Sequence, residues 1–386
     1  MANIFGNATH HNEIGPITFE KLVSTEQHKL LGWNFPVEEL HLVHPHWRGY
    51  AAPPFFYHLF MFIVYFFMMT ISSLGNGLVV FIFSTSKNLR TPSNLFILNL
   101  AIFDLAMMLE MPMFLVNSAV EYIVGFESAC NIYAALGSIS GQGAAITNAM
   151  IAFDRYRTIS SPIDGRLNYV QATFLVIFTW FYATPFTIFP YVHIWNRYIP
   201  EGYLTTCSFD YLTEDSETRV FTMTLFIWAY AIPMSIIIIC YFKLFMKVKD
   251  HEAMLKEQAR KMNVKSLSAN QVKDTNVELR IAKAAVSIVI LFVCSWTPYA
   301  WVAITGAFGD RTLLTPSVSM LPAVAAKIVS CIDPWVYAVA HPKYRAELEK
   351  RLPWLGIREK ELTAPSKDSQ STKSADAESV VQSEVA

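Results

Sequence analysis

The chain has 386 residues, of which 53% are hydrophobic and only 16% are charged, and its formal net charge is −1. Soluble proteins carry about 25% charged residues, so this composition predicts a membrane protein. A net charge this close to zero argues against a nucleic-acid partner. The sequence contains no hydrolytic triad, phosphate-binding glycine loop or metal-ligand constellation, so no enzyme is predicted.

Residues 1–54 are polar to mixed and are interpreted as an extracellular segment, with one glycosylation sequon at Asn7. Residues 55–340 contain seven apolar stretches, each long enough to cross a bilayer as a helix. We therefore expect an all-α membrane protein with seven transmembrane helices. A short amphipathic eighth helix over 341–353 and a disordered cytoplasmic tail over 354–386 follow. The predicted spans are Phe55–Phe83, Ser93–Ala119, Cys130–Ile159, Tyr169–Trp195, Val220–Val248, Ala282–Phe308 and Thr315–Ala340.

Basic residues gather on one side of these spans. The segment from Lys243 to Lys283 contains ten Lys or Arg residues and five acidic ones. Basic loops stay in the cytoplasm, so the N-terminus is predicted outside and the C-terminus inside. Cys130 and Cys207 then both face the oxidising outer side, which favours a disulfide between them. We expect that bond to hold a β-hairpin-like second outer loop across the mouth of the bundle.

The seventh span contains a lysine, Lys327, about 12 residues or roughly 18 Å of helix from either end. Its ammonium group cannot reach the membrane surface from there, and burying it costs about 3 kcal/mol. One interpretation is an internal salt bridge or a water-filled cavity. The other is a reactive amine, because a desolvated lysine forms Schiff bases with aldehydes. The lysine alone does not decide between them.

The inner ends of the third and sixth spans contain opposite charges. Asp154-Arg155-Tyr156 lies about 25 residues, or roughly 37 Å, beyond Cys130. Glu278 lies at the same end of the sixth span, so an Arg155–Glu278 bridge is predicted to close a cytoplasmic cleft. The alternative is a juxtamembrane charge cluster without such a role.

Two spans contain prolines beside residues suited to switching. Trp296-Thr297-Pro298 predicts a kink below a large aromatic side chain, and Asp333-Pro334-x-x-Tyr337 predicts a second kink. Charges inside spans find partners, so Asn76 and Asp104 are expected to meet Asp333 in a buried polar cluster.

Taken together, these residues resemble the rhodopsin-like G-protein-coupled receptors over about Gly32 to Trp354. Lys327 narrows the resemblance to the opsins, in which that lysine binds 11-cis retinal as an imine. His341-Pro342-Lys343 resembles invertebrate Gq-coupled visual opsins, and Leu109-Glu110-Met111-Pro112 resembles insect blue-type opsins. Asp333 departs from the usual asparagine. The matching positions are Gly75, Asn76, Asp104, Asp154, Arg155, Tyr156, Trp180, Pro233, Tyr241, Trp296, Pro298, Asp333, Pro334 and Tyr337.

This resemblance implies a covalently bound chromophore, 11-cis retinal or 11-cis 3-hydroxyretinal. A protonated imine in a low-dielectric pocket needs a counter-charge. Vertebrate visual opsins have a glutamate three residues after the helix-three cysteine, where this chain has the neutral Tyr133. Glu201 matches the outer-loop counterion of invertebrate opsins, and Glu110 is expected to tune a blue-absorbing pigment. The expected apolar sleeve is Phe221, Phe226, Trp296, Tyr299 and Ala300.

The resemblance also implies partners and a location. Light would isomerise the chromophore, push on Trp296 and move helix six, which activates a Gq-type G protein. A receptor kinase and arrestin are the expected partners of the tail, and the expected location is the plasma membrane of the photoreceptor rhabdomere, with lipid around the bundle. The candidate phosphorylation sites are Ser366, Ser369, Ser371, Thr372 and Ser374.

Other functions compete with a light-sensing receptor. A receptor for a diffusible amine or peptide is opposed by Lys327. A retinal-driven pump or channel is opposed by Asp154-Arg155-Tyr156, the outer disulfide and the long basic third inner loop. A retinal photoisomerase without signalling is a further alternative.

Overall fold

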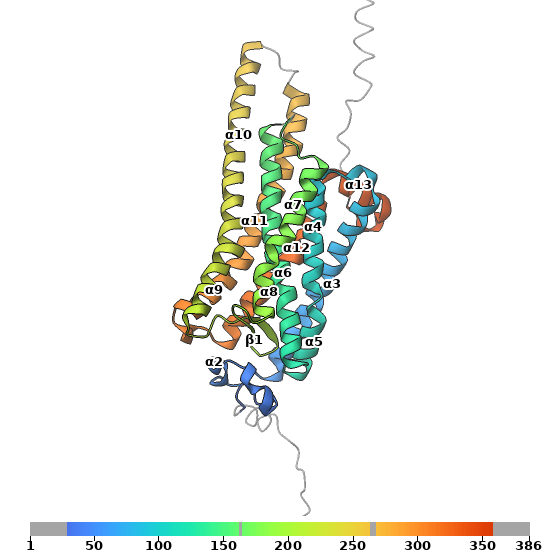
Figure 1. The fold of residues 1–386 in the computed structure, drawn as a ribbon. Helices are drawn as coiled ribbons and strands as arrows, with labels where there is room; N and C mark the ends of the chain where they lie inside the picture. The colour runs from blue at the N-terminus through green and yellow to red at the C-terminus, as the bar shows by residue number, and fades with distance from the viewer. Residues whose placement is uncertain (1–28, 162–163, 263–267, 358–386) are drawn as a thin grey trace, which may run out of the picture.

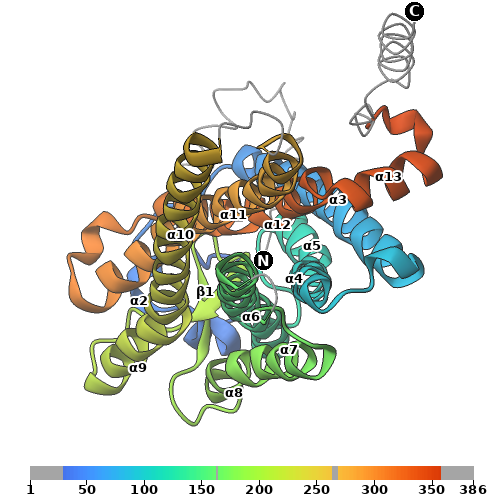
Figure 2. The same cartoon turned by 90° about the horizontal axis from the view of Figure 1, so that it is seen from above.

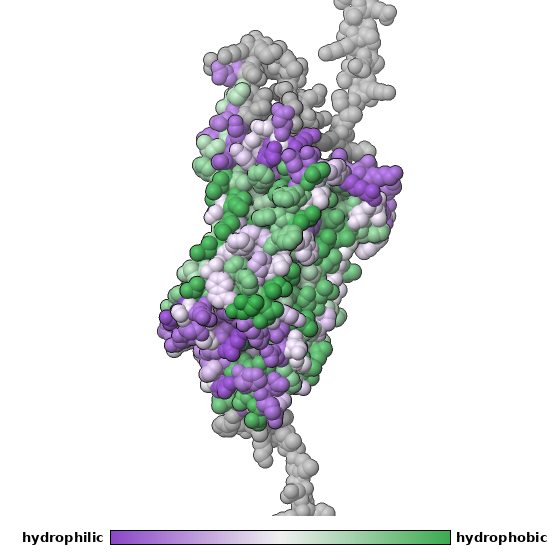
Figure 3. Space-filling model, in the orientation of Figure 1, coloured by the Kyte–Doolittle hydropathy of each residue, from purple (hydrophilic) through white to green (hydrophobic). Residues whose placement is uncertain are grey.

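The computed structural model describes residues 29–161, 164–262 and 268–357, which form an elongated bundle of helices (Figure 1). Within these residues, six helices are long and apolar enough to cross a membrane. The space-filling view shows a hydrophobic middle zone between hydrophilic ends, as expected of a chain that crosses a membrane several times (Figure 3). The bundle consists of α3 (Phe55–Thr85), α4 (Pro92–Met108), α5 (Met111–Val120), α6 (Phe126–Ser160), α7 (Tyr169–Ala183), α8 (Pro185–Tyr191), α9 (Ser216–Phe226), η3 (Ile227–Ala231), α10 (Ile232–Met262), α11 (Ser268–Phe308) and α12 (Pro316–Ala340).

The smaller elements lie at the two ends of the bundle. An antiparallel hairpin pairs Tyr198 with Phe209 and Glu201 with Thr206. It lies at the same end as α2, and α13 lies toward the opposite end (Figure 1). The predicted hairpin in the second outer loop is therefore confirmed. These elements are η1 (Val37–Leu42), α2 (Pro45–Arg48), η2 (Lys87–Leu89), β1 (Tyr198–Glu201), β2 (Thr206–Phe209), η4 (Arg311–Leu313), α13 (Pro342–Arg351) and η5 (Pro353–Leu355).

The third span of the fold, α6, lies between α4, α7 and α10 (Figure 2). Its middle turns are nearly all buried from Ser140 to Ala152, and they include many small and polar residues. Because neighbouring helices shield it, α6 does not need the apolar surface that lipid contact demands. This explains why α6 is not among the six strongly apolar helices.

Several helix boundaries differ from the sequence prediction for identifiable reasons. The second span breaks at Leu109–Glu110, because Pro112 has no N–H group and its ring crowds the carbonyl four residues earlier, at Met108. The fourth span breaks at Thr184, just before Pro185, and ends at Tyr191 rather than Trp195. The fifth begins at Ser216, where Asp215 caps the helix by accepting from the Thr218 N–H at 2.6 Å.

An outer cap covers the hairpin end of the bundle. Leu31, Phe35, Val43 and Trp47 from the N-terminal segment pack against residues of the second outer loop and of α11. Trp47 is fully buried although it precedes the first span. The cap and hairpin therefore close the outer end of the bundle over its interior.

Candidate functional site

Lys327 lies in the middle of α12 and is largely buried, with a side chain that is 12% exposed. Its Nζ lies 3.1 Å from Oε1 of Glu110, whose side chain is 1% exposed. Both side chains line one cavity inside the bundle. The structure therefore contains the internal salt bridge that the sequence left as one alternative, and it also places the amine at a cavity wall.

The helix break at Leu109–Glu110 accounts for the position of Glu110. Glu110 directly precedes α5 and its carbonyl accepts from the Phe114 N–H at 3.2 Å. Its carboxyl group lies against the backbone of α6 at Gly137, where an added Cβ would stand 2.7 Å from Oε2. A side chain at position 137 would thus displace the carboxylate.

Tyrosine rings flank the amine. The ring centroids of Tyr65 and Tyr133 each lie 5.9 Å from Nζ of Lys327. Both rings are buried, and their hydroxyl groups have no hydrogen-bond partner among the described residues. Tyr133 was expected near the amine, but nothing in the sequence pointed to Tyr65, which lies on α3 among many other aromatic residues.

The second acid of the cavity is Glu201, at the end of β1. The hydroxyl of Tyr211 donates to its Oε2 at 2.9 Å. Burial raises the pKa of Glu201 to about 7, and this effect outweighs the opposing influences of Tyr211 and Lys327. The carboxyl group therefore changes charge close to neutral pH.

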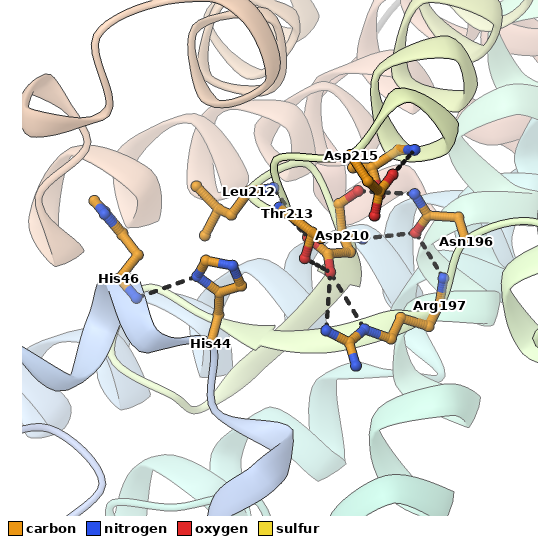
Figure 4. Close-up of polar contacts among 9 residues, drawn as sticks. His44, His46, Asn196, Arg197, Asp210, Leu212, Thr213 and Asp215 are labelled. Atoms are coloured by element: carbon orange, nitrogen blue, oxygen red, sulfur yellow. Dashed lines mark hydrogen bonds and ion pairs between the residues drawn. The ribbon is translucent and has the colours of Figure 1, made fainter.

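The predicted Cys130–Cys207 disulfide is present and holds β2 against the outer end of α6. A polar cluster around Asp210 stiffens the rest of the loop (Figure 4). Asp210 accepts from Arg197 at 3.2 Å and from Thr213 at 2.6 Å, and its N–H donates to Asn196 at 2.9 Å. Glu201 is thus supported by a loop that is anchored at two places.

The cavity is open on one side and is lined mainly by apolar and aromatic side chains. Pockets for small organic ligands are lined in the same way, with a few polar groups that fix the ligand's orientation. Of the expected sleeve, Phe226, Trp296, Tyr299 and Ala300 line it, whereas Phe221 packs behind the wall against Phe209. Lining residues that sequence reasoning missed include Met107, Gln142, Tyr198, Phe209, Tyr230 and Phe292.

Trp296 lies where the cavity meets the bundle core. Its ring packs against α6 at Gly141, where an added Cβ would stand 2.5 Å from the indole. The ring centroids of Phe292 and Tyr299 lie 5.9 and 6.3 Å away. A ligand that pushes this indole toward α6 therefore meets the backbone of that helix.

The polar residues inside the spans form two groups. Asn76 donates to the Ser330 carbonyl at 2.8 Å, which ties α3 to α12. Asp104 and Asp333 are both buried and interact electrostatically with each other. No hydrogen bond to Asp333 is found among the described residues, and Asn76 bonds to α12 one turn away, so the meeting of all three residues in one cluster stays a prediction.

At the inner end of α6, Asp154 accepts from the Ser93 hydroxyl at 3.1 Å, and the Tyr156 ring lies 5.8 Å from the Lys243 amine. Tyr241 packs partly buried against the core beside them. The side chains of Glu278 and Tyr337 lie outside the described residues, so the Arg155–Glu278 bridge stays a prediction.

His341 caps the start of α13, where its Nδ1 accepts from the Tyr344 N–H at 3.4 Å. Pro342 and Lys343 form the first turn of that helix. Asn7 and the serines and threonine of the tail, Ser366, Ser369, Ser371, Thr372 and Ser374, lie outside the described residues.

Comparison with known proteins identifies this arrangement. Residues 75–337 match the family described as "7 transmembrane receptor (rhodopsin family)", and the chain belongs to that family. Squid rhodopsin has the same fold, with a TM-score of 0.77 and 33% identity over 84% of this chain and 97% of that one. The chain is a receptor rather than an enzyme.

Within the family, the chain is an opsin. It is 61% identical to opsin Rh5 of Drosophila melanogaster over 86% of this chain and 88% of that protein. It is 55% identical to the blue-sensitive opsin of Apis mellifera over 92% of this chain and 95% of that protein.

Proposed function

We propose that this chain is a blue-absorbing visual pigment that binds 11-cis retinal, or 11-cis 3-hydroxyretinal, at Lys327 and activates a Gq-type G protein. The observation that supports this most strongly is the Lys327 amine, paired with Glu110 inside the bundle at the wall of a cavity with apolar and aromatic lining. When bound, the chromophore supplies light absorption and a change of shape. The protein's own residues hold the chromophore, stabilise its charge and pass its change of shape to the helices.

The residues present fit such a group. A polyene aldehyde needs an amine at one end and an apolar, aromatic sleeve along its length, and α6, α9 and α11 supply that sleeve. The rings of Tyr65 and Tyr133 and the Glu110 carboxylate stand around the amine. A positively charged nitrogen at this position would therefore face one carboxylate and two aromatic rings.

We assign the counterion role to Glu201 and the spectral role to Glu110. Glu201 is buried beside the cavity, and Tyr211 orients its carboxyl group. Glu110 already contacts the amine, so a negative charge there stabilises the ground state of a protonated imine and favours short-wavelength absorption. The similarity to a blue-sensitive opsin supports this assignment of colour.

Signal transfer would begin at Trp296, whose indole packs against α6. A shift of this ring moves α11 about its proline, Pro298, while Lys327 couples the ligand to α12 and its own proline, Pro334. At the inner end, Asp154, Arg155, Tyr156, Tyr241 and Glu278 would form the latch that opens for the G protein.

The remaining assignments follow from membership of the opsin group. The chain would lie in the photoreceptor plasma membrane with its N-terminus outside, and the His341-Pro342-Lys343 turn would help to select the Gq class. Phosphorylation of the tail by a receptor kinase would recruit arrestin.

The test is an absorption spectrum of the purified protein after incubation with 11-cis retinal, taken in the dark and after illumination, with nucleotide exchange on a Gq-type α subunit measured alongside. We expect a blue band, a light-induced change and light-dependent exchange, none of which occurs in Lys327→Ala. A pigment that isomerises without nucleotide exchange would instead indicate a photoisomerase. Activation by an amine or peptide without retinal would indicate a receptor for a diffusible ligand.

A further inference from the structure

Lys327 can attack an aldehyde only after losing a proton, because an ammonium group has no lone pair. The atom that contacts its Nζ is Oε1 of Glu110, at 3.1 Å. This is within the range over which a side chain transfers a proton as a general base. Glu110 also lines the cavity that would hold the aldehyde, and its Oε2 has no hydrogen-bond partner among the described residues.

The other titratable groups that face the amine are less suited to this task. Tyr65 and Tyr133 face it with their rings, 5.9 Å away, and a phenol is a poor proton acceptor at neutral pH. The Oε2 of Glu201 accepts from Tyr211, and no contact joins Glu201 to Lys327 among the described side chains. Among the described residues around the amine, only Glu110 both contacts Nζ of Lys327 and has a second carboxylate oxygen without a hydrogen bond.

We propose that Glu110 transfers protons during covalent attachment of the aldehyde to Lys327, a role that rests on the proposed function but differs from colour tuning. Of the three ammonium protons, one passes to Glu110 and returns from it to the aldehyde oxygen. The second moves from nitrogen to that oxygen, and the third stays on nitrogen. The nitrogen forms two bonds to the aldehyde carbon, and the oxygen leaves as water with its bonding electrons. The charges before and after are the same, one cationic nitrogen beside one carboxylate.

Gly137 is the positioning residue for this transfer. An added Cβ there would stand 2.7 Å from Oε2 of Glu110, so Gly137→Ala must push the carboxylate away from α6 and alter its contact with Lys327. Gly77 on α3 offers a matched control, because an added Cβ there meets nothing within 4 Å. Both substitutions place alanine in a helix, where its propensity exceeds that of glycine.

The experiment measures the rate at which 11-cis retinal becomes covalently attached to full-length, ligand-free protein, by trapping the adduct with acid at successive times and at several pH values. We expect Glu110→Gln to slow attachment about 10²-fold, the lower end of the usual contribution of general acid–base catalysis. Its rate should also rise with pH, because the Lys327 amine must then lose its proton to solvent, whereas the wild-type rate should vary less. Glu110→Asp should recover part of the rate. Gly137→Ala should slow attachment and Gly77→Ala should not.

An infrared readout on the ligand-free protein keeps the test independent of the pigment. A carboxylate band should disappear in Glu110→Gln, shift in Gly137→Ala and stay unchanged in Gly77→Ala. If Glu110→Gln does not fold, the attachment rates of Glu110→Asp and Gly137→Ala are compared with those of the wild type and Gly77→Ala instead.

Attachment at the wild-type rate and with the wild-type pH profile in Glu110→Gln would overturn the proposal, as would identical rates for Gly137→Ala and Gly77→Ala. A wild-type protein that forms no adduct at all would instead refute the proposed function.

Discussion

Removing the charge of Lys327 tests both the ion pair and the site of attachment. Lys327→Met keeps most of the side-chain volume but leaves the Glu110 carboxylate buried, at 1% exposure, without its cation. At an effective dielectric constant of about 20, unit charges 3.1 Å apart attract each other by about 5 kcal/mol. Removing one partner of a buried pair costs roughly 3–5 kcal/mol. We therefore expect the unfolding free energy of ligand-free Lys327→Met to be roughly 3–5 kcal/mol lower than that of the wild type.

The assay is a double-mutant cycle of wild type, Lys327→Met, Glu110→Gln and the double variant. Unfolding of the ligand-free protein in detergent is followed by tryptophan fluorescence. The double variant should be more stable than the sum of the single losses predicts, because no uncompensated charge remains. Lys327→Met should also form no acid-stable adduct with retinal. Losses that add to within about 0.5 kcal/mol would show that the two side chains do not interact, which would refute the reasoning.

The remaining predictions concern the two acids and their neighbours. The visible band is lost when the imine loses its proton at high pH, and a spectral titration gives the pH at which this happens. Glu201→Gln should lower that pH more than Tyr133→Phe does. The reverse order would show that Glu201 is not the counterion. Glu110→Lys should convert much of the visible band to an ultraviolet one, while Glu110→Gln should move the band to longer wavelength; an unaltered Glu110→Lys spectrum would place Glu110 away from the chromophore. Burial raises the pKa of Glu201 from 4.5 to about 7, so the ligand-free protein should lose about 3 kcal/mol of stability as pH rises from below 4.5 through about 7. Glu201→Gln should abolish that loss. If the unfolding free energies of both proteins, measured by denaturation at several pH values, fall equally as pH rises, the prediction is wrong.

The seven-helix architecture, the disulfide and the outer hairpin could all be predicted from local sequence. Span length and the absence of charge report directly on membrane crossing, since each residue of a span must tolerate lipid or protein around it. The position of α6 shows where this signal weakens. Its buried, small and polar residues from Ser140 to Ala152 reflect neighbouring helices rather than lipid.

The candidate site could be predicted in part. Lys327 stands out because an ammonium group at mid-membrane must have a partner inside the protein, so its burial followed from the sequence alone. The sequence alone did not show which residue that partner is. Helix two was expected to run without interruption, and only the break before Pro112 shows how Glu110 turns toward the amine.

The sequence by itself therefore determined the membrane class, the spans, the buried amine and the family, because each depends on residue type and on spacing along one helix. Tertiary structure alone decided which acid touches Lys327, that Tyr211 holds Glu201, that Gly137 makes room for Glu110, and that Phe221 stands behind the cavity wall. These contacts join α4–α5, α6, α12 and an outer hairpin that are far apart in the chain. Their distances depend on helix breaks and packing, which local patterns do not encode.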